Sequence, residues 1–65
     1  MSTSDELKTQ GNDHFVSGAY AEAIKSYSSA IDTFGPTAVL LTNRAAARIG
    51  LEELALARDD ATAAI

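Results

Sequence analysis

The sequence contains no cysteine and no tryptophan among its 65 residues. Without cysteine, neither a disulfide framework nor a thiolate metal site can form. A domain of this size buries only about 60% of the surface that its unfolded chain exposes. It must therefore gain stability from packing, from repeats that stack on one another or from a partner. The lack of cysteine also fits a cytoplasmic protein, which is the location we expect.

Basic residues are scarce, with five lysines and arginines against nine aspartates and glutamates and a net charge of −4. Proteins that bind nucleic acid usually carry a basic face, so we expect no nucleic-acid partner. No apolar run approaches the ~20 residues of a membrane-spanning helix. The stretch 1–10 is polar and lacks the apolar centre of a secretory signal. We therefore expect no membrane partner.

The sequence also lacks the residue groupings that carry catalysis. It shows no nucleophile–base pair, no phosphate-binding glycine loop and no cluster of metal ligands. His14 is the one histidine, so we interpret it as a packing or surface residue. Asp59 and Asp60 are neighbours, which do not face each other on a helix; we interpret them as solvated, or one of them as paired within the fold. We expect a protein that is not an enzyme and that needs no cofactor or metal.

Four segments of helical length make up the chain. Gly18, Gly35–Pro36 and Gly50 separate them, and alanine and other good helix formers dominate in between. We expect helices over residues 4–17, 19–33, 37–49 and 52–65. In the second segment, one apolar stripe of an amphipathic helix is formed by Ala23, Ile24, Tyr27, Ala30, Ile31 and Phe34.

The sequence repeats its pattern after 34 residues. This shift matches apolar or small residues in the pairs Leu7 and Leu41, Gly11 and Ala45, Tyr20 and Leu54, Ala23 and Ala57, Tyr27 and Ala61, Ala30 and Ala64, and Ile31 and Ile65. A 34-residue period of paired helices is the tetratricopeptide signature. It predicts an all-α fold of two helix-turn-helix repeats in one domain, about residues 4–36 and 37–65. Small residues such as Gly11 and Ala23 should let the two helices of a hairpin approach closely.

The repeats carry a family resemblance. Residues 11–31 read GNxxFxxGxYxxAIxxYxxAI and resemble the first tetratricopeptide repeat of chaperone-binding proteins. Residues 41–46 read LxNRAA and resemble the opening of their second repeat. The resemblance covers Leu7 to Ile65. It implies a protein-interaction module of a co-chaperone, similar to the adaptor that links heat-shock proteins 70 and 90.

The resemblance also implies a binding site. In repeats of the carboxylate-clamp type, the inner helices line a groove that grips the C-terminal carboxylate and last aspartate of heat-shock protein 90 or 70. Lys8 and Asn12 share one helix face, and with Asn43 they have the spacing of this clamp. The ammonium supplies charge and the two amides supply N–H donors. Weaker candidates for peptide contacts are Phe15, Arg44 and Arg48.

Several alternatives stay open. Asn12 and Asn43 could hydrogen-bond to each other between the inner helices, a role that can coexist with ligand binding. The same repeats precede phosphatase, prolyl isomerase or ubiquitin-ligase domains in known families, so the chain could target an enzyme, or it could be a scaffold repeat with other partners. The family takes two further basic residues from a third repeat, and about three repeats make a stable array. We expect a fragment of a longer array, or self-association through the uncapped last helix.

Overall fold

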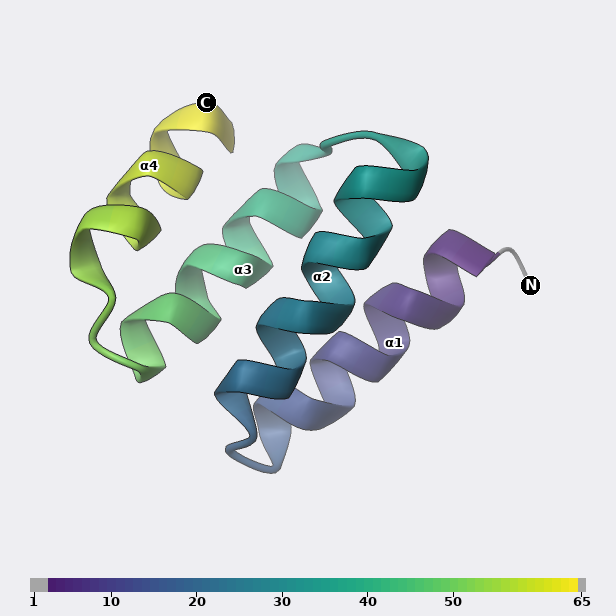
Figure 1. Ribbon diagram of the computed structural model, residues 1–65, viewed down its shortest axis with the longest axis horizontal. Coiled ribbons are helices and arrows are strands. Elements are labelled where there is room, and N and C mark those ends of the chain that lie inside the picture. The colour runs from purple at the N-terminus through teal and green to yellow at the C-terminus, as the bar shows by residue number, and fades with distance from the viewer. Residues whose placement is uncertain (1–2, 65) are drawn as a thin grey trace.

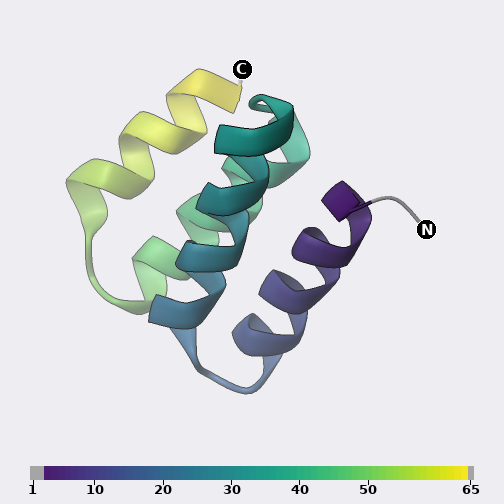
Figure 2. The same ribbon diagram turned by 45° about the vertical axis from the view of Figure 1, so that its right-hand side comes forward.

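The computed structural model describes the backbone of residues 3–64 and the side chains of residues 5–64. This part of the chain forms four helices, which are α1 Thr3–Val16, α2 Tyr20–Phe34, α3 Ala38–Gly50 and α4 Leu54–Ala64 (Figure 1). They form two antiparallel hairpins, and α3 of the second hairpin packs against α2 of the first (Figure 2). The predicted all-α fold of two tetratricopeptide-type hairpins is confirmed.

The helix boundaries lie within two residues of those expected from the sequence. The expected end of the last helix at Ile65 lies outside the described residues. Within residues 3–64, no helix is long and apolar enough to cross a membrane.

The core is centred on Tyr27, whose side chain is 1% exposed. Its buried neighbours are Ala23 and Ala30 of α2 and Leu40 and Ala47 of α3. The phenol ring also lies directly against α1, since a Cβ atom added to Gly11 would stand 2.5 Å from the ring carbon Cε1 of Tyr27. Only glycine leaves room for the ring at this place, which confirms the expected role of a small residue at Gly11 in the approach of α1 and α2.

The prediction is wrong for one member of the α2 stripe. The side chain of Phe34 is 48% exposed, although its spacing places it with the core residues. Phe34 is the last residue of α2, and the chain turns away at Gly35 with a φ of 93°. Helical spacing predicts burial only along the stretch that a neighbouring helix covers, and Phe34 is at the end of that stretch.

The turns inside the two hairpins have the same geometry. After α1, the N–H of Ala19 donates to the carbonyl of His14 at 2.8 Å. After α3, the N–H of Glu53 donates to the carbonyl of Arg48, also at 2.8 Å. Both contacts close a Schellman motif, in which the residue before the donor takes the left-handed backbone conformation.

The left-handed residue is Gly18 in the first turn, with a φ of 83°, and Glu52 in the second, with a φ of 61°. Left-handed backbone costs an L side chain about 1–2 kcal/mol, which glycine avoids. We predict that Glu52→Gly raises the free energy of unfolding by about 1 kcal/mol, and that Gly18→Ala lowers it by a similar amount. Urea denaturation measures both changes. A Glu52→Gly variant that is no more stable than the parent would contradict this account of the turn.

Candidate peptide-binding site

Two asparagines from different hairpins meet at the candidate site. The Nδ2 group of Asn43 on α3 donates to Oδ1 of Asn12 on α1 at 3.3 Å. The hydroxyl of Tyr27 on α2 donates to the same oxygen. The hydrogen bond between the asparagines, which the sequence left as an alternative role, is therefore present. This hydrogen bond joins α1 to α3.

These two donors occupy the carbonyl side of the Asn12 amide. An amide oxygen has two lone pairs, and here each faces a donor. The Nδ2 group of Asn12 carries two N–H donors and has no partner among the described residues, and the side chain is exposed. Asn43 also keeps one N–H that Asn12 does not use. The pair therefore offers N–H donors to a ligand oxygen.

Lys8 contributes a positive charge to the same region of α1. It precedes Asn12 by four residues, so the two side chains share one face of the helix. Lys8 is half-buried, and its ammonium makes no ion pair or hydrogen bond within the described part of the chain. A cation and amide donors suit a carboxylate, because hydrogen bonds to an ionised acceptor are about twice as strong as neutral ones.

Phe15 packs within the first hairpin. Its ring meets the ring of Tyr20 edge-on, with the centroids 5.4 Å apart and an angle of 67° between the planes. Both rings are half-buried at the margin of the core. An additional contact of Phe15 with a peptide, which the sequence suggested, stays a prediction.

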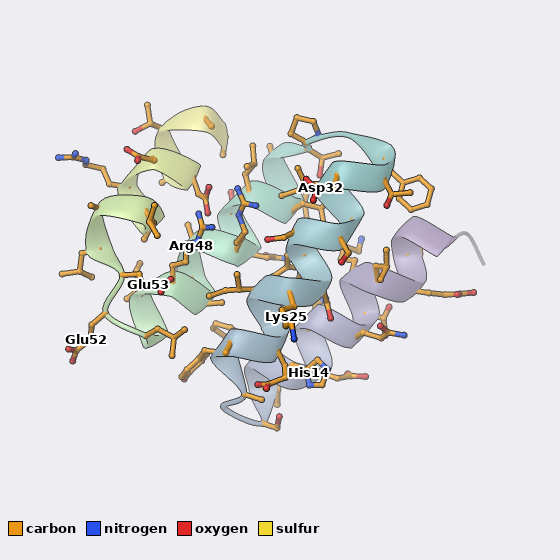
Figure 3. The ribbon with its side chains drawn as sticks, viewed as in Figure 1. His14, Lys25, Asp32, Arg48, Glu52 and Glu53 are labelled. Atoms are coloured by element: carbon orange, nitrogen blue, oxygen red, sulfur yellow. The ribbon has the colours of Figure 1, made fainter. Side chains whose placement is uncertain are left out.

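Arg44 and Arg48 bind a carboxylate of the chain itself. Arg44 donates through Nε and Nη2 to Asp60 at 2.9 and 2.8 Å, and Arg48 donates through Nη1 at 2.6 Å. Arg44 also donates to Oγ of Ser28 at 3.1 Å, so the cluster joins α2, α3 and α4. Figure 3 shows Arg48 on the side of α3 that faces α4. Within the described side chains, neither guanidinium donates to Asn12 or Asn43.

Asp60 is the residue whose importance the sequence understated. It is 5% exposed, whereas its neighbour Asp59 is exposed, so the expectation that one of the two is paired within the fold is confirmed. Burial raises the pKa of the Asp60 carboxyl, but hydrogen bonds and positive charge from Arg44 and Arg48 outweigh this effect. The net result is a pKa below the usual value of an aspartate. The hydrogen bond with Asp60 in turn raises the pKa of Arg44.

We predict that Asp60→Asn lowers the free energy of unfolding by about 3 kcal/mol at pH 7, because two largely buried guanidinium groups lose their counter-charge. The exposed neighbour is the control, since Asp59→Asn should change stability by less than about 0.5 kcal/mol. The folded pKa of Asp60 lies below that of the unfolded chain, near 3.9. Its stabilisation is therefore full above about pH 5 and is lost as the pH falls through the folded pKa.

Urea denaturation followed by circular dichroism, at pH 7 and at pH 3, checks this prediction. The difference in stability between the parent and Asp60→Asn should be smaller at pH 3 than at pH 7. If the Asp60→Asn and Asp59→Asn variants are equally stable at pH 7, the ion pairs of Asp60 with Arg44 and Arg48 do not stabilise the second hairpin.

Comparisons with known proteins agree with this fold. The chain is 45% identical over 58 residues to RNA polymerase II-associated protein 3 of Xenopus tropicalis, which is 89% of the chain and 9% of the relative. It is 42% identical over all 65 residues to serine/threonine-protein phosphatase 5 of Homo sapiens, of which it covers 13%. Both relatives contain tetratricopeptide repeats. The likeness supports a tetratricopeptide protein-interaction module.

The chain spans only about a tenth of the length of the curated relatives it matches. The match to the phosphatase does not reach its catalytic domain. No protein-family model and no solved structure matches the chain.

Proposed function

We propose that the chain is an interaction module of a co-chaperone, which binds the acidic C-terminal tail of heat-shock protein 90 or heat-shock protein 70 in the cytoplasm. The observation that supports this best is the contact between Asn12 and Asn43. It puts N–H donors from the inner helices of both hairpins at one place, and Lys8 lies one helical turn away along α1.

The site suits a carboxylate, and in the clamp that the sequence resembles this is the C-terminal carboxylate of a peptide. A terminal carboxylate has two charged oxygens, which can accept from the Lys8 ammonium and from both amides. Each charge-assisted hydrogen bond contributes roughly 1.5–3 kcal/mol net. Capture of an extended peptide by its C-terminal carboxylate is an established mode of recognition. The three residues make a partial clamp, and Phe15 is the neighbouring apolar side chain that could contact the tail.

The same proposal includes a longer assembly. Leu54 and Leu56 of α4 are 62% and 47% exposed. A further hairpin of the same array, or a second copy of the chain, would cover these side chains. In this proposal the two repeats, about residues 4–36 and 37–65, are part of a longer tetratricopeptide domain.

The first test uses an acidic peptide with a free C-terminal carboxylate and its amidated twin. We predict that the chain binds the free carboxylate more tightly, that Lys8→Ala weakens this binding about 10-fold, and that affinity falls with salt because exposed charges are screened. Lys25, an exposed lysine on α2, is the matched control, and Lys25→Ala should bind like the parent. Calorimetric titration measures each affinity. Equal binding of the two peptides by the parent would refute the clamp.

A second test separates the donors of Asn12 from its role in the fold. Asn12→Asp keeps oxygens that can accept from Tyr27 and Asn43, but it replaces both N–H donors with a negative charge. We predict that this variant keeps the helical content of the parent and loses its preference for the free carboxylate. Circular dichroism and the same titrations measure these properties. If Asn12→Asp still prefers the free carboxylate, Asn12 is not a ligand donor.

The match of the whole chain to serine/threonine-protein phosphatase 5 favours a second candidate, in which the module directs an enzyme to its partners. A phosphatase is the enzyme that this relative suggests, and the family resemblance adds prolyl isomerases and ubiquitin ligases. A scaffold repeat with other partners is a third candidate. The complete reading frame that encodes the chain distinguishes them, because a catalytic domain in it would favour the targeting module.

A further inference from the structure

One core side chain reaches the candidate site. Tyr27 is the largest fully buried side chain of the described residues. Its hydroxyl donates to Oδ1 of Asn12, whose side chain is exposed. A single hydrogen bond therefore connects the centre of the core to the amide that we propose as a ligand donor.

The position of the Tyr27 hydroxyl is set by close packing around its ring. The ring lies among alanines that are fully buried, Ala23, Ala30 and Ala47. On the α1 side it lies against the backbone of Gly11, with no room for even one added carbon. Protein interiors are packed as densely as organic crystals, so a ring in such a place has little freedom to shift. The position of its hydroxyl next to α1 is therefore restricted as well.

We propose that Tyr27 is a positioning residue of the candidate clamp, holding the Asn12 amide with its oxygen inward and its N–H donors outward for a ligand carboxylate. The inference rests on the proposed function. Reversing the amide would turn the Nδ2 group of Asn12 toward the Nδ2 group of Asn43, so that two donors would meet. The reversed amide would lose both of the hydrogen bonds that Oδ1 now accepts. It could donate instead to the oxygen of the Tyr27 hydroxyl, but its contact with the Nδ2 group of Asn43 would stay unsatisfied.

The arrangement also orders the second asparagine. Asn43 donates to the same oxygen as Tyr27, so a fixed Asn12 carbonyl gives Asn43 a fixed partner. The Tyr27 hydroxyl is protonated at neutral pH, as tyrosine ordinarily is, and burial raises its pKa further, so it can donate a hydrogen bond to Asn12. Preorganised donors bind more tightly because the ligand does not have to order them.

The first experiment deletes the hydroxyl and keeps the ring. We predict that Tyr27→Phe binds the free-carboxylate peptide about 3- to 10-fold more weakly than the parent, and binds the amidated twin equally well. Tyr20→Phe is the matched control, because it removes a phenol hydroxyl that has no hydrogen bond to either asparagine. In an Asn12→Ala background, Tyr27→Phe should cause no further loss. A loss of the same size in that background would overturn the positioning role.

The second experiment needs no peptide. In proton–nitrogen NMR spectra of the free chain, Tyr27→Phe should shift the side-chain amide signals of Asn12 and Asn43. The signals of Gln10, an exposed amide on α1, should stay in place. Unmoved Asn12 signals would overturn the inference. If the parent chain distinguishes the two peptides, a Tyr27→Phe variant that binds the free-carboxylate peptide as tightly as the parent would overturn it too. A parent chain that does not distinguish the two peptides refutes the proposed function, and the NMR result then still decides whether the Tyr27 hydroxyl contacts Asn12.

Discussion

The contact between the Tyr27 ring and the backbone of α1 at Gly11 is the constraint on which the first hairpin depends. It sets how closely α1 and α2 approach, because a ring fills the space that any other residue at position 11 would take. The same packing places the phenol hydroxyl next to the exposed side chain of Asn12, where it donates to Oδ1. The core and the candidate site therefore share a residue, and donors supported by a packed core are held more precisely than donors on a loop.

In the second hairpin, an ion-pair cluster joins the helices where a packed aromatic ring joins them in the first. The position 34 residues after Tyr27 is Ala61, which is exposed, so this hairpin has no aromatic ring at its centre. Its helices are joined instead by Asp60, which accepts from Arg44 and Arg48. Desolvation offsets much of the attraction in a buried ion pair, so its main effect is to fix how the helices sit against each other. The Nε group of Arg48 is buried without a partner in the described part of the chain, which adds to that cost.

The sequence predicted the elements well and the contacts between them unevenly. Helix boundaries follow from glycine and proline, and the role of Gly11 follows from its place in the 34-residue period. The sequence left open which of Asp59 and Asp60 is paired, and the position of Asp60, three residues after the core residue Ala57 and so on the same helix face, is the signal that favours it. The hydrogen bond from Tyr27 to Asn12 could not be predicted. Periodicity tells which face a side chain lies on, whereas this bond depends on the distance between two helices, which packing alone determines.

The 34-residue register also limits how the chain could associate with itself. On α3, Leu40 and Ala47 pack into the core formed with α2. The matching residues of α1 are Glu6 and Asp13, which are acidic and exposed. If α1 of a second copy docked on α4 as α3 docks on α2, these two carboxylates would enter the contact, and each is costly to bury unless it is paired. A head-to-tail chain of copies therefore lacks the purely apolar residues that α3 presents to α2 at these two positions.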